Sequence, residues 1–171
     1  MRLHFLATGL LAASTLTAST LAAAAGQKEK VTETVKLDAP PAKVWARIGH
    51  FGDLSWHPAV KKTEASDGDK ADSQRRLDLG GPVLWEALVS HNAAEHKYRY
   101  RILDNGENQK VLPVSHYVST LQVKPSGKGS EVIWVSTFEP AAGTTPEAAK
   151  KAIAGVYRGG LDHLDKALAD N

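Results

Sequence analysis

Apolar and polar positions alternate along most of the chain. In the segment 31–37, Val31, Val35 and Leu37 share one face, while threonine and lysine occupy the other. A period of two predicts a β-strand. Further strand-like runs follow at 60–65, 75–79, 83–90, 97–103, 114–123 and 131–138. The short turn-forming sequences between successive runs predict antiparallel pairing in a meander.

Two short segments after the first strand have a different pattern. Pro41 suits the first turn of a helix, and apolar residues at helical spacing follow it up to Gly49. A second short helix or turn is expected over 51–56. It must stop at His57-Pro58, because the residue before a proline avoids the helical region.

The chain closes with one long amphipathic helix, expected over 146–169. Thr144 or Thr145 is the candidate N-cap residue. The apolar stripe repeats every three or four positions and consists of Ile153, Val156, Tyr157, Gly160, Leu161, Leu164 and Leu168. About 24 residues at ~1.5 Å each span roughly 36 Å, so this helix needs the broad concave side of the sheet. The predicted fold is therefore α+β: a curved antiparallel sheet of about seven strands around a long C-terminal helix, with two short helices after the first strand.

Composition narrows the range of possible chemistry. The 171 residues suffice for one domain, and a hydrophobic fraction of 42% excludes a disordered chain. With 21 Lys and Arg against 19 Asp and Glu, the chain lacks the basic excess of a nucleic-acid-binding protein. The absence of cysteine excludes disulfides, iron–sulfur clusters and cysteine nucleophiles. No histidine pair has the spacing of a helical metal site, so neither a metal nor a cofactor is expected.

Residues 1–25 have the composition of a secretory signal peptide. Arg2 precedes a long apolar run rich in Ala, Leu and Thr, which ends in small residues. We expect cleavage after Ala24 or Ala25, which leaves a mature domain at 26–171. This domain is expected to be secreted, and in a Gram-negative bacterium its destination would be the periplasm. An uncleaved membrane anchor is the alternative, because ~20 apolar residues can cross a bilayer. After cleavage no membrane span is expected.

The order of elements and three segments carry a resemblance to a known family. The segments are APPAKVWARIGHFGDLSWHPAV after the first strand, EVIWVSTFEP in the last strand and GVYRGGLDHL in the terminal helix. Across 31–170 the chain resembles the START/Bet v1-like superfamily, the polyketide cyclase/dehydrase and lipid-transport (helix-grip) group. Within it, FGDLSWHPAV and the secreted form are similar to the MxaD-like periplasmic proteins. That similarity implies an accessory role between a periplasmic quinoprotein methanol dehydrogenase and its cytochrome.

The helix-grip resemblance also implies a cavity between the long helix and the sheet. Such pockets are mostly apolar, with a few placed polar groups, so the expected partner is a small apolar or aromatic ligand. The candidate lining residues are large aromatic or polar side chains on faces that can point inward: Trp56, Trp85, Tyr98, Tyr100, His116, Trp134, Phe138 and Tyr157. For each of them, ordinary core packing is the alternative.

Few residues are candidates for catalysis. His57 and His116 are candidate general bases near neutral pH, and Glu86 is a candidate acid or base. A hydrogen-bonded structural role is the alternative for each histidine, and the face of Glu86 stays open because either face of its strand can be the buried one. Arg75, in a pair of arginines, is typical of a solvated edge. We expect a non-catalytic binding or accessory protein, with a cyclase- or dehydratase-type enzyme and a carrier of lipid-like molecules as alternatives.

Overall fold

The computed structural model describes residues 26–169, so the signal peptide predicted for residues 1–25 lies outside the described residues. The strands are β1 (Glu29–Leu37), β2 (Lys62–Ala65), β3 (Gln74–Asp78), β4 (Val83–Asn92), β5 (Lys97–Ile102), β6 (Val114–Ser126) and β7 (Gly129–Pro140). The helices within the described range are α2 (Pro41–Ile48), α3 (Gly106–Val111) and α4 (Pro146–Ala169).

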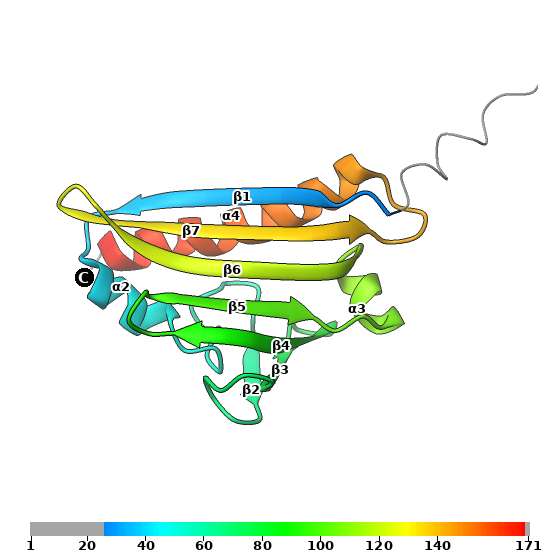
Figure 1. Cartoon of the computed structure of the whole chain (residues 1–171), viewed down its shortest axis with the longest axis horizontal. Coiled ribbons are helices and arrows are strands. Elements are labelled where there is room, and N and C mark those ends of the chain that lie inside the picture. The colour runs from blue at the N-terminus through cyan, green and yellow to red at the C-terminus, as the bar shows by residue number, and fades with distance from the viewer. Residues whose placement is uncertain (1–25, 170–171) are drawn as a thin grey trace, which may run out of the picture.

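The strands form one antiparallel sheet in the order β1-β7-β6-β5-β4-β3-β2. After β1, which forms one edge of the sheet, the chain runs through a meander from β2 at the opposite edge to β7, which pairs with β1. The sheet curves, and α4 lies along its β1–β7 side, with α2 and α3 near opposite ends (Figure 1). The predicted α+β helix-grip fold is therefore confirmed.

The segment 51–56 consists of turns and contains no helix. Its amides are bound by side chains from elsewhere in the chain. The amide of Phe51 donates to Oδ1 of Asp69 at 2.7 Å, and the amide of Leu54 donates to Oγ1 of Thr63 at 3.2 Å. Because these bonds replace the helical ones, the two predicted short helices after β1 reduce to one, α2.

The second short helix of the described chain is α3, in a region where only a turn was predicted. Its N-cap residue is Asn105, whose side chain accepts a hydrogen bond of 2.8 Å from the amide of Asn108. Asn108 is buried, and its side-chain amide in turn binds the backbone of Trp85 and Leu103. These bonds tie α3 to β4 and to the end of β5.

The terminal helix has the predicted bounds, and Thr145 is the N-cap residue of the two candidates. Its Oγ1 accepts a hydrogen bond of 3.2 Å from the amide of Ala148. The helix buries one face against the sheet, made by Ala149, Ile153, Tyr157, Gly160, Leu161 and Leu164. No helix in the range 26–169 is long and apolar enough to cross a membrane.

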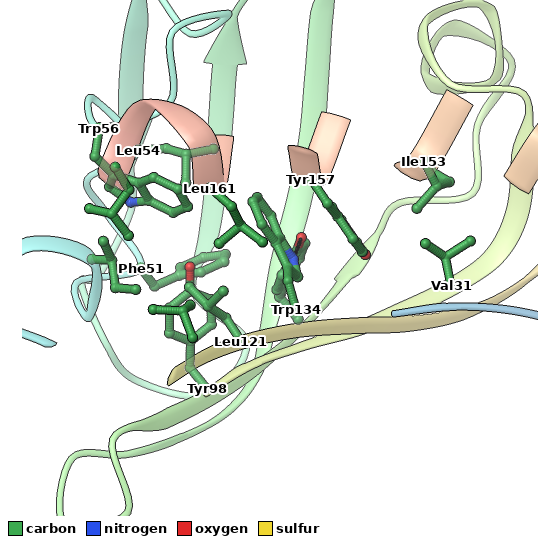
Figure 2. Close-up of a cluster of buried hydrophobic side chains, with 14 of the residues drawn as sticks. Val31, Phe51, Leu54, Trp56, Tyr98, Leu121, Trp134, Ile153, Tyr157 and Leu161 are labelled. Carbon is green, nitrogen blue, oxygen red and sulfur yellow. Dashed lines mark hydrogen bonds between the residues drawn. The ribbon is translucent and has the colours of Figure 1, made fainter. Parts of the chain in front are cut away.

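Aromatic rings fill the centre of the space between sheet and helix. Trp134 rises from β7 toward α4, and Tyr157 comes down from the helix to meet it (Figure 2). The two rings stack with centroids 4.3 Å apart, and Trp56 packs against Trp134 at 5.5 Å. The fold therefore has a solid aromatic centre, and any empty space must lie to one side of it.

Candidate functional site

A cavity of about 210 Å³ lies between the concave face of the sheet, α4 and the loop 54–60. Its walls are mostly apolar, formed by Leu54, Ala59, Val60, Leu77, Leu79, Leu84, Ile102, Val111, Leu112, Ile153 and Val156. The other lining side chains carry a hydrogen-bonding group: His57, Glu86, Tyr100, Tyr117, Trp134 and Tyr157. An apolar pocket with a few convergent polar groups is the usual form of a small-molecule site.

Three of the eight predicted lining residues border this cavity: Tyr100, Trp134 and Tyr157. Trp56, Tyr98 and Phe138 are buried, but they pack within the core and do not line the cavity. Phe138, for example, stacks on Tyr117 with ring centroids 6.2 Å apart. These three residues are therefore ordinary core residues, which was the stated alternative.

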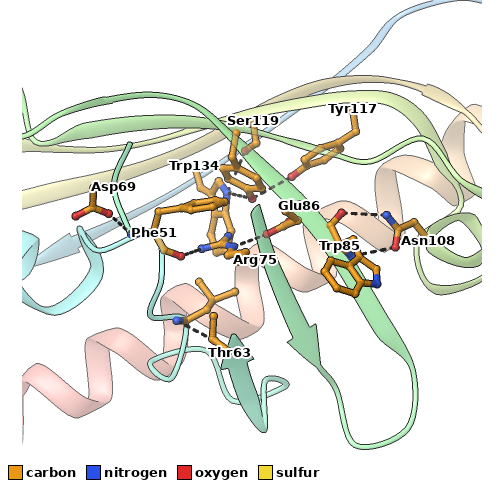
Figure 3. A network of polar contacts seen from close by, with 12 residues as sticks. Phe51, Thr63, Asp69, Arg75, Trp85, Glu86, Asn108, Tyr117, Ser119 and Trp134 are labelled. Atoms are coloured by element: carbon orange, nitrogen blue, oxygen red, sulfur yellow. Dashed lines mark hydrogen bonds and ion pairs between the residues drawn. The ribbon is translucent and has the colours of Figure 1, made fainter. Parts of the chain in front are cut away.

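Trp85 points away from the cavity, against the prediction. It lies opposite Arg76 on the outer face of the sheet, and it is 39% exposed. The inward face of β4 is the alternate set, Leu84, Glu86 and Leu88, all of them buried. Figure 3 shows Trp85 and Glu86 on opposite sides of the strand. In the pairing of β3 with β4, Glu86 lies opposite Arg75. The ion pair between these two side chains allows the carboxylate to face inward.

His116 is also outside the cavity, and its neighbour Tyr117 takes the inward place. A bulge between Ser115 and Val118 shifts the pairing of β6 with β7. Even-numbered residues face inward before the bulge, and odd-numbered residues face inward after it. His116 has a positive φ of 48°. Its exposed ring binds Oε2 of Glu139 at 3.2 Å on the surface. Tyr117 was not among the predicted lining residues. The sequence signal for it is the alternation Tyr117, Ser119, Leu121 and Val123, which is out of step with Val114.

The hydroxyl groups of three tyrosines and one serine meet beside the cavity. Tyr157 bonds Ser119 at 3.0 Å, Tyr117 bonds Tyr157, and Tyr100 approaches Tyr117 at 3.3 Å. The indole Nε1–H of Trp134 donates to Tyr100 at 3.0 Å and to Ser119 at 3.1 Å. This group, Tyr100, Tyr117, Ser119, Trp134 and Tyr157, is called the hydroxyl cluster below.

The direction of the protons in the hydroxyl cluster follows from its last member. Ser119 donates its proton to the carbonyl oxygen of Val135 at 3.0 Å. A hydroxyl has one proton, so Tyr157 must be the donor in its bond to Ser119. By the same count, Tyr117 donates to Tyr157, and Tyr100 donates to Tyr117. Each hydroxyl proton therefore has an acceptor inside the protein.

Burial keeps these tyrosines protonated. It raises the pKa of Tyr157 to about 12, although the hydrogen bonds that Tyr157 shares with Ser119 and Tyr117 oppose the rise. Burial also raises the pKa of Tyr100 and of Tyr117 well above the ordinary tyrosine value. At neutral pH all three are hydrogen-bond donors and none is an anionic base.

Glu86 and Arg75 form a buried ion pair at the wall of the cavity (Figure 3). Nε of Arg75 donates to Oε2 of Glu86 at 2.6 Å, and Nη1 donates to the carbonyl of Phe51 at 2.7 Å. The guanidinium carbon lies 4.2 Å from the centre of the Phe51 ring and 5.1 Å from that of Tyr100. Arg75, predicted at a solvated edge, is thus completely enclosed, with a side chain that has no exposed area.

The pair is electrostatically coupled. Burial raises the pKa of Glu86, and the adjacent Arg75 charge opposes that rise. Burial by itself lowers the pKa of Arg75, but the Glu86 carboxylate, together with Tyr98 and Tyr100, outweighs that effect, so the pKa of Arg75 lies above its ordinary value. Arginine therefore stays charged here, and its charge keeps the carboxylate as the stable form of its partner.

His57 lines the cavity, yet both of its ring nitrogens are occupied. Nε2–H donates to the backbone carbonyl of Val156 in α4 at 2.9 Å, and Nδ1 accepts from the amide of Ala59 at 3.2 Å. Burial lowers the pKa of His57, although the bond to Val156 acts in the opposite direction. The neutral ring connects the loop 54–60 to α4 through hydrogen bonds, and it has no free nitrogen for proton transfer.

No group of three or more histidine, aspartate or glutamate residues within 26–169 is arranged to hold a metal ion. The polar groups at the cavity can therefore bind through hydrogen bonds, and Glu86 offers the only carboxylate among the lining residues.

Comparison with known proteins identifies the family. The sequence model described as "Polyketide cyclase / dehydrase and lipid transport" matches residues 28–169. No curated protein sequence matches the chain. Protein XoxI from Bacillus cereus is 30% identical over 82% of this chain and 96% of its own, with a TM-score of 0.73. A putative uncharacterised protein from Bacillus thuringiensis is 30% identical over 83% of this chain and all (100%) of its own, with a TM-score of 0.72.

More distant structures share the fold alone. Norcoclaurine synthase from Thalictrum flavum is 13% identical over 96% of this chain and 99% of its own, with a TM-score of 0.66. The helix-grip architecture is therefore common to proteins of very different sequence. The extent of the family match and the 30% identical structures together show that this chain belongs to the polyketide cyclase/dehydrase and lipid transport family of the START/Bet v1-like superfamily.

Proposed function

We propose that this protein binds a small, largely apolar molecule in the cavity between sheet and helix. The single observation that carries the proposal is the cavity itself, whose apolar walls enclose about 210 Å³ beside a carboxylate and the hydroxyl cluster. Polar groups buried at the edge of an apolar space fix the orientation of a ligand in most small-molecule sites. The family supports the same conclusion, since its description includes lipid transport.

The fold is compatible with such a ligand. Norcoclaurine synthase, which shares it, has been crystallised in complex with dopamine and hydroxybenzaldehyde, two small aromatic molecules. For a cyclase- or dehydratase-type reaction in this chain, His57 is a poor base because both ring nitrogens are bonded. Only Glu86 would then remain as an acid or base, and its pairing with Arg75 favours a binding role.

Binding can be tested with toluene and p-cresol as probes, followed by amide shifts in two-dimensional NMR spectra. We expect saturable shifts at residues around the cavity. Val156→Phe places a bulky aromatic ring at the cavity wall and should abolish these shifts. Val89→Phe, on the exposed outer face of β4, should leave the shifts unchanged. The absence of saturable binding by either probe, or full binding by Val156→Phe, would contradict the proposal.

The narrower assignment rests on the N-terminal sequence and on the FGDLSWHPAV segment. It holds that the protein is exported to the periplasm and assists electron transfer from a quinoprotein dehydrogenase to its cytochrome by surface contact. A mature N-terminus at Ala25 or Gly26 in periplasmic extracts would support export. The rate of dehydrogenase-to-cytochrome transfer, measured with and without the purified protein, tests the accessory role, and an unchanged rate would remove it.

A further inference from the structure

The polar groups at the cavity differ in what they leave free for a ligand. Among the donors, His57 gives its proton to Val156, and Trp134 gives its own to two hydroxyl oxygens. The four hydroxyls of the cluster pass their protons in one direction to the carbonyl of Val135. Every donor among the lining residues is therefore used within the protein, whereas Nη2 of Arg75, which lies behind the lining, is a buried donor without a partner.

Among the lining residues, the hydrogen-bonding capacity that is left unused is that of an acceptor. Glu86 lines the cavity, and its one hydrogen bond within the described chain joins Oε2 to Nε of Arg75. A carboxylate has two oxygens with about four lone-pair positions, so Oε1 is free to accept. An acceptor left without a donor in an apolar space is costly. The cavity is therefore suited to a ligand that presents an O–H or N–H group to Glu86.

Charge selects between donors. Arg75 already neutralises Glu86, and the pair together carries no net charge. A cationic ligand would leave one uncompensated positive charge in a mostly apolar site, and an anionic ligand would face the carboxylate. Burial of an unpaired charge is strongly unfavourable. A neutral hydroxyl group meets the requirement of the free oxygen without either penalty.

The volume limits the size of the molecule. A dry apolar cavity of about 150 Å³ holds benzene. The present cavity of about 210 Å³ exceeds that by the room for a few further atoms. One aromatic ring with one or two small substituents fills this volume, whereas a fused polycyclic ring system or an acyl chain of lipid length would have to extend out through the open side of the cavity.

We propose that the cavity binds a neutral single-ring hydroxyl compound, a simple phenol, whose O–H donates to Oε1 of Glu86 while its ring contacts the apolar wall. This inference rests on the proposed function and adds the class of ligand.

The proposal is tested with four neutral probes on the wild-type protein. p-Cresol carries a donor, p-tolualdehyde carries only an acceptor, toluene carries neither, and 2-naphthol adds a second ring. We expect p-cresol to bind about tenfold more tightly than toluene, because a hydrogen bond to a charged acceptor stabilises a complex. p-Tolualdehyde should gain nothing over toluene, and 2-naphthol should bind at least tenfold more weakly than p-cresol.

A pair of matched double variants assigns the effect to Glu86. In Arg75→Met/Glu86→Leu the buried ion pair is replaced by apolar side chains, which proteins often tolerate, and the preference for p-cresol over toluene should fall to about one. In the control, Arg76→Met/Glu64→Leu, an exposed ion pair of the same two residue types is removed. The control should keep the tenfold preference.

The outcomes separate this proposal from the general one. Equal binding of p-cresol and p-tolualdehyde, a preference that persists without Glu86, or 2-naphthol bound as tightly as p-cresol would each overturn the phenol assignment. If neither toluene nor p-cresol binds, it is the proposed function that fails. The four-probe comparison uses only the wild-type chain, so it decides the matter even where the buried double variant does not fold.

Discussion

At the scale of single residues, Gly160 sets how closely α4 approaches the sheet. A Cβ added at this position would lie 2.6 Å from Cδ2 of His57 and 3.1 Å from the Trp134 ring. Neither neighbour is free to move, because His57 is bonded through both nitrogens and Trp134 through its indole N–H. Glycine is therefore required here by close packing and not by its backbone conformation.

Gly160→Ala should destabilise the protein by about 1–3 kcal/mol, the usual effect of overpacking a core. Alanine's better helix propensity, worth ~1 kcal/mol, opposes this loss without cancelling it. Gly159→Ala is the matched control, because no atom lies within 4 Å of its added Cβ. The control should gain up to ~1 kcal/mol in urea-induced unfolding. Equal stability of the two variants would show that the helix can shift away from His57.

The Arg75–Glu86 pair gives a second prediction at this scale. Glu86→Gln leaves the enclosed guanidinium without its counter-charge and should lower the free energy of unfolding by about 3–5 kcal/mol. Arg75→Met/Glu86→Leu, which removes both charges, should recover most of that loss. Urea denaturation of the two variants measures the difference. A Glu86→Gln protein as stable as wild type would mean that the pair is not desolvated in solution.

His57 predicts a dependence of stability on pH. In the unfolded chain histidine binds a proton near pH 6.5, whereas burial lowers the pKa of folded His57, with the charges of His163 and Arg75 acting in the same direction. Below pH 6.5 the unfolded state then holds more protons, so the free energy of unfolding falls with the pH. Urea unfolding at pH 7.5 and 5.0 should show a smaller fall for His57→Gln than for wild type. Parallel falls would assign the effect to other groups.

At the scale of elements, the β3–β4 hairpin explains why a charge pair lies in the core. Gly80 and Gly81 both have positive φ, and the turn centred on them places Arg75 opposite Glu86. That register was accessible from the sequence, because a tight hairpin pairs residues equidistant from its turn. Considered singly, Arg75 resembles a solvated residue and Trp85 a core residue. Considered as cross-strand partners, Arg75 and Glu86 satisfy one another, and Trp85 is left outside.

The β6 bulge was harder to predict. Before it Val114 faces inward, and after it Tyr117 does, so a constant alternation from Val114 places His116 in the cavity. The bulge is supported by tertiary contacts that no local pattern announces. The amide of His116 donates to Asp104 at 2.8 Å, and its ring binds Glu139. The candidate site was therefore only partly predictable.

The start of α4 gives an element-scale prediction. Thr145 caps the helix through its hydroxyl, while the side chain of Thr144 makes no hydrogen bond within the described chain. Thr145→Ala should cost about 1 kcal/mol of stability, as the loss of an N-cap usually does. Thr144→Ala should change the urea midpoint little. A larger effect at Thr144 would place the start of the helix one residue earlier.

At the scale of the whole molecule, the architecture was predictable because it rests on periodicity. Strand and helix periods, short turns and one long apolar stripe define the layers, and all of them are local properties of the sequence. The cavity is a different kind of feature. It is the space left where Trp134 and Tyr157 stop filling the interior, and it depends on side chains from most of the elements at once.

Ligand binding should stabilise the whole fold, because the cavity exists only when sheet, helix and loop are assembled. At a p-cresol concentration about 100 times its Kd, the free energy of unfolding should rise by about 2.7 kcal/mol. The midpoint of thermal unfolding, followed by circular dichroism, should increase with p-cresol concentration for wild type and stay constant for Val156→Phe. A constant midpoint for wild type would contradict binding to the folded state.

The stacking of Trp134 on Tyr157 has a practical consequence. Of the four tryptophans in the chain, Trp134 alone lines the cavity. Its indole is hydrogen-bonded to two hydroxyls and faces whatever enters the space beside it. The intrinsic fluorescence of Trp134 should therefore change when a ligand binds in the cavity, so that binding can be followed without an attached dye.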